Sequence, residues 1–244
     1  MSIWYAINMD LSDLNIEQAA AVKHTYGPQL VVAGAGTGKT TVITRRIAYL
    51  LEQNLAKPQE ILALTFTEKA AGELLDRLDV LLGWQAYQVN AMTFHAFGSQ
   101  LISRFAHRLG MSSHSQVLTE TSKLVLLKDN IDSLKLGYYG RQQDMLDFVR
   151  SKLELISELQ NQDITPVIYR QIIEAKKIEG TLHEQVIFEL EDNALIYDLY
   201  ESVKRKYNVI DYYDQIQIPL LLLQQNPHIV EKLSHEYQFF MVDE

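Results

Sequence analysis

The chain has 244 residues, of which 47% are hydrophobic and 22% charged, as in a soluble globular protein with one large or two small domains. It contains no cysteine, which excludes a disulfide framework and thiolate metal sites, and its seven histidines form no recognised metal-binding spacing. The formal net charge of −9 excludes a uniformly positive surface that coats nucleic acid, so any nucleic-acid contact must be local.

We expect neither a secretory signal nor a membrane span. The N-terminus lacks a basic region followed by an apolar core, and Asp10 and Asp13 come early. The apolar run Pro219–Leu223 is far too short to cross a bilayer. A cytoplasmic protein without a membrane partner is therefore expected.

A helix start precedes the first expected strand. Asn15 is suited to the N-cap position, and Gln18, at the third helical position, completes a capping box. The amide of Gln18 both donates and accepts hydrogen bonds, so it could also read an adenine. The two roles are compatible, and the spacing alone favours the cap.

A phosphate-binding loop is the strongest signal in the chain. Leu30–Val32 predicts a strand that leads to a helix near Lys39–Gln53, which includes the amphipathic stretch Val42–Leu51. The sequence that follows the strand, A-G-A-G-T-G-K-T, matches the P-loop pattern apart from its first residue. The candidate nucleotide-binding residues are Ala33, Gly34, Ala35, Gly36, Thr37, Gly38, Lys39, Thr40 and Thr41.

Each part of such a loop has a chemical role. Backbone N–H groups and the helix N-terminus bind phosphates, the lysine (Lys39) reaches the outer phosphates, and the hydroxyl of Thr40 ligates Mg²⁺. The loop therefore predicts a site for ATP or GTP. The alternative is a glycine-rich turn that binds no ligand.

Two further strand–helix units follow the loop. Ile61–Thr65 leads to a helix near Glu68–Leu82, and Val89–Thr93 leads to a helix near His95–Leu109. Strands that alternate with helices predict a parallel α/β sheet.

Aromatic and polar residues follow these two strands. In open α/β sheets, ligands bind beyond the carboxyl ends of the strands. Phe66 and Phe94 could stack on bases there, and threonine or His95 could bind phosphates. The alternative is that both phenylalanines are core residues and that His95 is an ordinary surface histidine.

The pattern changes between Gly110 and Tyr207. Apolar residues such as Leu124, Leu127 and Ile131 recur at helical spacing, and no strand is predicted. Residues 111–200 carry 9 Lys and Arg against 15 Asp and Glu, which makes them the more acidic part of the chain. We expect a helical insertion inside the α/β domain.

The last segment returns to the α/β pattern. Ile210–Leu223 predicts a helix interrupted by Pro219, and Tyr237–Val242 predicts a buried strand that leads to Asp243 and Glu244. An apolar strand followed by Asp-Glu resembles a Walker B motif. In that motif one carboxylate holds Mg²⁺ and the next activates the attacking water.

In their order along the chain, these signals resemble the motifs at the N-terminus of UvrD/Rep-like superfamily 1 DNA helicases. The matching segments are Leu14–Val22 (Q motif), Ala33–Thr40 (motif I), Leu62–Leu74 (motif Ia), Thr93–His95, Asp211–Asp214 and Met241–Glu244 (first half of motif II).

The resemblance implies a RecA-like P-loop NTPase domain, 1A, over residues 1–109 and 208–244, with an all-helical domain, 1B, inserted at 110–207. It also implies that the chain is truncated at motif II. The remainder of the helicase, with a second RecA-like domain that supplies arginines to the γ-phosphate, would then be a partner. The isolated chain is expected to have little activity.

The resemblance also implies a role for each matching residue. ATP and Mg²⁺ would be the cofactors, with Gln18 on the adenine, Lys39 on the phosphates, Thr40 and Asp243 on the metal, and Glu244 as catalytic base. The residues implied to face single-stranded DNA are Phe66, Thr67, Thr93 and His95. Glu68 stands where the family usually has Asn.

The activity implied is ATP-dependent 3′–5′ translocation on DNA. The alternatives are the motor portion of a helicase–nuclease subunit and an ATP- or DNA-binding chain without turnover.

Overall fold

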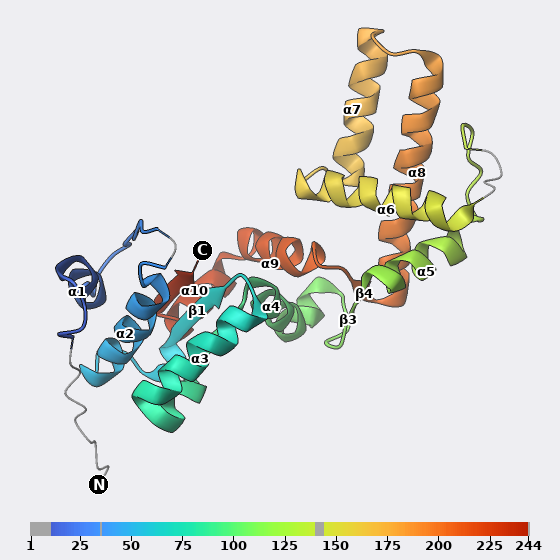
Figure 1. Ribbon diagram of the computed structural model, residues 1–244. Coiled ribbons are helices and arrows are strands. Elements are labelled where there is room, and N and C mark those ends of the chain that lie inside the picture. Colours follow the sequence, from blue (N-terminus) through green and yellow to red (C-terminus); the bar gives the residue numbers. More distant parts are fainter. Residues whose placement is uncertain (1–10, 35, 140–143, 244) are drawn as a thin grey trace. The chain divides into compact units, whose positions relative to one another are not determined.

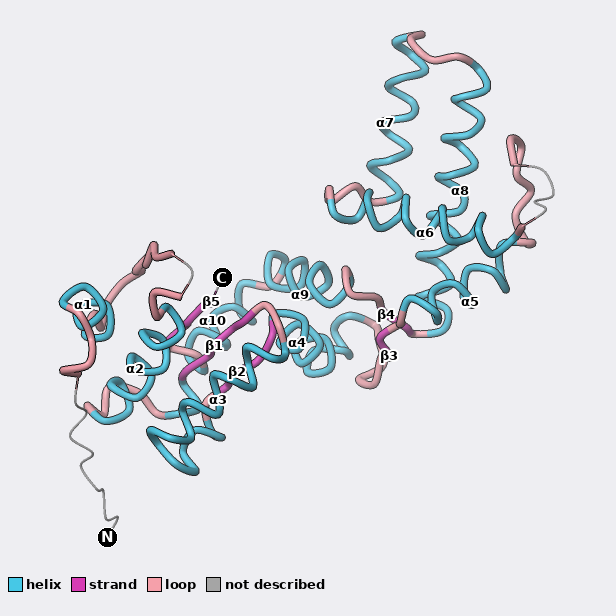
Figure 2. Tube along the Cα trace, in the orientation of Figure 1, coloured by secondary structure: helices cyan, strands magenta, loops and turns pink. Residues whose placement is uncertain are grey.

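The computed structural model describes residues 11–34, 36–139 and 144–243 (Figures 1 and 2). The chain divides into two compact units, one formed by Met1–Ser99 with Leu220–Glu244 and the other by Gln100–Pro219. Two long helices, α4 (Phe94–Leu109) and α9 (Asp214–Gln225), carry the chain from one unit to the other.

The first unit is built around a parallel sheet. Its described elements, besides parts of α4 and α9, are α1 (Ile16–Lys23), α2 (Lys39–Glu52), β1 (Ile61–Thr65), α3 (Glu68–Leu82), β2 (Asn90–Thr93), α10 (Pro227–Glu236) and β5 (Phe239–Asp243), with short 3₁₀ segments at Pro58–Glu60 and Gly83–Gln88. The described strands pair in the order β2-β1-β5 (Figure 2). Every residue of β1 is buried, as expected for a central parallel strand.

The register of the sheet aligns the ends of its strands. Thr65 of β1 pairs with Thr93 of β2 on one side and with Asp243 of β5 on the other. The chemistry-bearing residues that end or follow these strands therefore share one edge of the sheet.

The core of the first unit lies between the sheet and two helices. Ile47 and Leu50 of α2 and Leu74 and Leu78 of α3 are almost fully buried, and they pack with Ile61, Ala63 and Met241. These apolar residues recur at helical spacing in α2 and α3, which explains why both helices form as predicted.

One strand prediction is wrong. Residues 28–34 are described and lie outside every helix and strand, and Leu30 and Val32 are 88% and 87% exposed. The β-branched run has the local preference for a strand, but that preference depends on packing and pairing with neighbours. At Leu30–Val32 neither is present in the structure.

The second unit is mostly helical. Besides parts of α4 and α9, it contains β3 (Gln116–Val117), α5 (Glu120–Ile131), α6 (Met145–Asn161), α7 (Pro166–Glu179), α8 (Glu184–Tyr207) and β4 (Val209–Ile210). Figure 1 shows α7 and α8 side by side. Leu127, Val149, Ile156, Tyr197 and Tyr200 are among the residues of its core.

One feature of this unit differs from the sequence prediction. No strand was predicted between residues 110 and 207, but Gln116 and Val117 pair in parallel with Val209 and Ile210. A strand of two residues has no periodicity to detect, because distant pairing alone defines it.

None of the helices in the described ranges combines the length and the apolar character needed to span a membrane.

Candidate nucleotide and nucleic-acid site

The glycine-rich loop leads directly into α2. Gly38 is the N-cap of this helix and has φ +90°, a left-handed conformation that side chains disfavour. A Cβ atom at Gly38 would also lie 3.0 Å from Nε2 of Gln18. Because Gly38 offers no side-chain cap to α2, the first N–H groups of the helix are suited to bind an anion.

Lys39, the first residue of α2, folds back over the loop. Its ammonium lies 3.3 Å from the carbonyl oxygen of Ala33 and 3.5 Å from that of Gly34. These are long hydrogen bonds, so phosphate oxygens would replace them at little cost. The ammonium therefore lies over the segment in which the expected phosphate site is found.

Thr40 and Asp243 meet although they lie 203 positions apart in the sequence. The hydroxyl Oγ1 of Thr40, on α2, donates to Oδ2 of Asp243, at the end of β5, over 3.1 Å. Both groups are half-buried oxygen ligands of the kind that Mg²⁺ prefers.

At this point the protein would offer Mg²⁺ only part of a coordination shell. Within the described ranges, no group of three or more His, Cys, Asp or Glu side chains could hold a metal ion. Mg²⁺ commonly keeps several waters and takes further oxygens from substrate phosphates. The pair formed by Thr40 and Asp243 fits such a phosphate-dependent site.

Gln18 is a capping residue, as its spacing predicts. The backbone N–H of Gln18 donates to Oδ1 of Asn15 (2.8 Å), and that of Asn15 donates to Oε1 of Gln18 (3.0 Å). The amide nitrogen of Gln18 also donates to the carbonyl oxygen of Thr37 over 2.9 Å. Gln18 thus ties α1 to the glycine-rich loop, a contact that the sequence did not reveal.

Other residues of the loop region close the loop or lie outside the described part. The hydroxyl of Thr37 donates to the carbonyl oxygen of Gly34 (2.7 Å), which closes a turn. Gly36 has φ +74°, and Thr41 lies in the first turn of α2. Ala35 and Glu244 lie outside the described residues.

Two phenylalanines emerge where β1 and β2 end. Phe66 is 72% exposed and Phe94 is 36% exposed, so the interpretation of Phe66 as a core residue is wrong. Thr67 is the N-cap of α3, where its hydroxyl accepts from the N–H of Ala70 (3.1 Å). His95 lies half-buried in the first turn of α4.

Thr93 is placed differently from its neighbours. Its side chain is buried, and its hydroxyl donates to Oε1 of Glu68 over 2.9 Å. No local pattern predicts this contact, because it joins the first residue of α3 to the last residue of β2. The sequence indicates only that Glu68 stands where the family usually has Asn.

The Asp211–Asp214 segment forms a buried ionic cluster in the second unit. Each of its two aspartates accepts from the backbone N–H of the other, over 2.9 and 3.0 Å, at the start of α9. The ammonium of Lys204, from α8, contacts Glu201, Asp211 and Asp214 over 2.8–2.9 Å.

Burial and charge shift the pKa values in this cluster in different directions. Burial raises the pKa of Glu201 and of Asp214. For Asp211 and Lys204, burial is opposed by their mutual attraction, which lowers the pKa of Asp211 and, together with the other carboxylates, raises that of Lys204. The cluster holds α8 and the start of α9 together, and none of its residues belongs to the expected nucleotide site.

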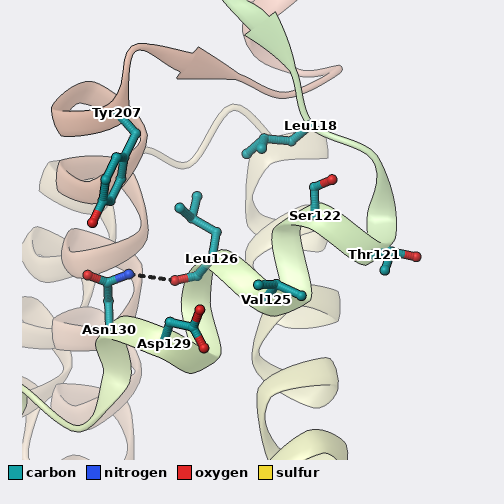
Figure 3. A pocket seen from close by; sticks show the side chains of 8 residues that line it. All are labelled: Leu118, Thr121, Ser122, Val125, Leu126, Asp129, Asn130 and Tyr207. Carbon is teal, nitrogen blue, oxygen red and sulfur yellow. Dashed lines mark hydrogen bonds between the residues drawn. The ribbon is translucent and has the colours of Figure 1, made fainter.

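A cavity of about 350 Å³ lies elsewhere in the second unit. It is lined by Leu118, Thr121, Ser122, Val125, Leu126, Asp129, Asn130 and Tyr207 (Figure 3). Figure 3 shows that Tyr207 of α8 lies across from the α5 residues, and Asn130 donates to the carbonyl oxygen of Leu126 over 2.8 Å. None of the residues expected to bind nucleotide or DNA contributes to this cavity.

Comparisons with known proteins agree with the motif order. The family model of the UvrD/REP helicase N-terminal domain matches residues 14–244. The chain is 33% identical over 243 residues to the ATP-dependent DNA helicase PcrA of Staphylococcus aureus (strain Mu50) and 32% identical over 238 residues to that of Staphylococcus epidermidis (strain RP62A). Each match covers 98% of this chain, which spans about 30% of the length of either relative.

Proposed function

The chain belongs to the family of UvrD/REP helicase N-terminal domains, and we propose that it is the ATP-binding part of an ATP-dependent DNA helicase. The observation that carries this proposal is the contact between Thr40 and Asp243. It brings the hydroxyl of a phosphate-binding loop and the carboxylate of a Walker B strand to one point, which is the arrangement that Mg·ATP requires.

In this proposal, different residues bind different parts of the nucleotide. The backbone of Ala33–Thr41 surrounds the phosphates, Lys39 neutralises the outer ones, and Gln18 contacts the adenine. Thr40 and Asp243 hold Mg²⁺, which bridges phosphate oxygens and offsets their charge. Glu244, next to Asp243, serves as the base for the attacking water.

Single-stranded DNA is proposed to bind along the same edge of the sheet. Phe66 and Thr67 follow β1, and His95 follows β2, which pairs with one side of β1. The strand β5, with Asp243, pairs with the other side. Neighbouring strands lie about 4.8 Å apart, so both sites touch the same short strands. A change in the state of the nucleotide bound next to Asp243 would then move the residues that bind the DNA. We propose that this movement results in 3′–5′ translocation.

We further propose the domain organisation of this family. Residues 1–109 and 208–244 form domain 1A, and the helical residues 110–207 form domain 1B inserted within it. A second RecA-like domain in the remainder of the helicase completes the ATP site. The 30% of each relative that the chain spans leaves room for such a domain.

The nucleotide site is tested with Lys39→Ala. We expect Mg·ATP to bind at least tenfold more weakly, because a hydrogen bond from a charged group contributes about 1.5–3 kcal/mol. Isothermal titration calorimetry measures the affinity. Lys69→Ala is the matched control, because its side chain is 86% exposed and pairs with Glu73 on the surface. Unchanged affinity in Lys39→Ala would contradict the assignment.

The DNA site is tested with Phe66→Ala. Stacking on an aromatic side chain is worth about 1–3 kcal/mol per base, so single-stranded DNA should bind roughly 5- to 150-fold more weakly. Fluorescence anisotropy with a labelled oligothymidylate measures this. Trp84→Ala is the control, because Trp84 is 70% exposed but lies in the 3₁₀ segment after α3. An unchanged affinity with a lowered thermal midpoint would make Phe66 a packing residue.

A third measurement separates a motor from a binding module. ATP hydrolysis is followed with and without single-stranded DNA. Hydrolysis stimulated by DNA supports the helicase proposal. Binding of both ligands without hydrolysis favours a chain that binds but does not turn over.

A further inference from the structure

The hydroxyl of Thr93 is engaged by protein groups on both sides. It donates to Oε1 of Glu68 (2.9 Å) and accepts from the backbone N–H of Ala96 (3.1 Å), and the residue is only 4% exposed. A hydroxyl has one hydrogen to donate, and a phosphate oxygen can only accept. Thr93 therefore has no hydrogen left for a DNA phosphate while it is bonded to Glu68.

Glu68 is well placed to hold that bond. It is the first residue of α3, directly after the N-cap Thr67, where the helix dipole favours a carboxylate. Glu68 is itself exposed, so its charge stays hydrated. Its bond to Thr93 joins the start of α3 to the end of β2.

The same bond lies close in the chain to the two exposed aromatic residues, Phe66 and Phe94. Phe66 lies between Thr65, whose hydroxyl donates to the carbonyl oxygen of Thr67 (3.0 Å), and Thr67. Phe94 directly follows Thr93. Thr65 and Thr93 are paired in the sheet. The bond between Glu68 and Thr93 therefore closes a ring of contacts at the backbone from which the side chains of Phe66 and Phe94 extend.

We propose that Glu68 is a positioning residue for single-stranded DNA and that it acts through Thr93 to hold Phe66 and Phe94 in place for stacking. This inference rests on the proposed DNA site. It reassigns Thr93 from a DNA contact to a link between the start of α3 and the end of β2. The carboxylate also repels nearby phosphates, so bases rather than backbone lie closest to it.

Two neutral substitutions test the proposal. Glu68→Gln and Glu68→Ala both remove the charge, but only glutamine keeps an oxygen that accepts from Thr93. Single-stranded oligothymidylate should bind Glu68→Ala about fivefold more weakly than Glu68→Gln, the effect of one hydrogen bond. Fluorescence anisotropy with the 244-residue chain measures both affinities, and the affinity of Glu68→Gln should equal or exceed that of the parent.

A second arm excludes a merely structural role. In the Phe66→Ala background, the difference between glutamine and alanine at position 68 should shrink, because the platform that Glu68 positions is gone. Thr93→Val should mimic Glu68→Ala, and Thr93→Ser, which keeps the hydroxyl, should restore binding. If Glu68→Ala does not fold, the comparison of Thr93→Val with Thr93→Ser decides in its place.

A difference in DNA affinity of the opposite sign, with Glu68→Ala binding more tightly than Glu68→Gln, overturns the proposal. If Thr93 contacts the DNA backbone itself, Glu68→Ala frees its hydroxyl and binds more tightly than Glu68→Gln. Equal binding of these two variants, or a difference that persists undiminished in Phe66→Ala, also overturns it. If the proposed DNA site itself is wrong, the results differ from these. The parent then does not bind the oligonucleotide, or Phe66→Ala leaves its binding unchanged.

Discussion

The two polar centres of this protein are built in contrasting ways. At the glycine-rich loop, Lys39 makes hydrogen bonds of 3.3 and 3.5 Å, and Thr40 meets Asp243 at 3.1 Å in a half-buried setting. Around Lys204, three carboxylates lie within 2.9 Å of one ammonium that is almost fully buried.

The contrast separates a site that can exchange partners from one that cannot. Long, partly hydrated bonds lose little when a phosphate or a metal replaces them. A buried ion pair that loses one partner leaves an uncompensated charge at high cost. The lysine that matters for ligand binding should therefore be expendable for stability, and the lysine that matters for stability should not affect the ligand.

The largest expected effect comes from removing the buried ammonium. Lys204→Met should lower the free energy of unfolding by about 3–5 kcal/mol, because three carboxylates stay behind without their cation. Lys39→Met should change it by less than about 0.5 kcal/mol. Urea unfolding followed by circular dichroism measures both. Equal stability losses in the two variants would remove the distinction.

The same cluster predicts a loss of stability at alkaline pH. Carboxylates raise the pKa of Lys204 above its ordinary value of 10.5, and burial raises the pKa of Tyr200 and Tyr197 above 10.0. Above pH 10 to 10.5 the unfolded chain releases protons that the folded chain keeps, so the free energy of unfolding falls as pH rises.

Urea titrations at pH 8 and pH 11 measure this dependence. Glu201→Gln is the informative variant, because burial raises the pKa of the Glu201 carboxyl and one negative charge fewer then surrounds Lys204. With a smaller rise in the pKa of Lys204, the alkaline loss should be smaller than in the parent. A loss that is the same in both proteins would show that the charge of Glu201 does not contribute to it.

The smallest expected effect concerns Gln18, which joins α1 to the loop. Gln18→Glu keeps an oxygen for the capping box but loses the N–H that reaches the carbonyl oxygen of Thr37. Its stability should stay within about 1 kcal/mol of the parent.

ATP affinity distinguishes the two proposed roles of Gln18. If the amide also reads the adenine, Gln18→Glu should bind ATP more weakly while its affinity for inorganic triphosphate falls less. Equal losses for both ligands would limit Gln18 to its capping role. Calorimetric titrations with the two ligands provide the comparison.

Much of the fold could be predicted from the sequence, because the patterns that indicate its helices, caps and loop are local. Helical spacing of apolar residues placed α2 and α3 within one residue, and the buried run Ile61–Thr65 was identified as a strand. The motif that ends in Lys39 and Thr40 and the cap at Asn15 and Gln18 also depend on neighbours in the chain. Such patterns are imposed by backbone geometry, so they can be detected without knowledge of the tertiary structure.

Only the tertiary structure decided which distant groups meet. The Glu68–Thr93 bond, the cluster around Lys204 and the pairing of Gln116–Val117 all join segments that no local pattern connects. The apolar run Leu30–Val32 shows that a local pattern alone is not sufficient. It has the local preference for a strand, but in the structure it does not pair with another strand. Pairing and burial are properties of the folded chain, and they determine both the strands that form and the side chains that act together.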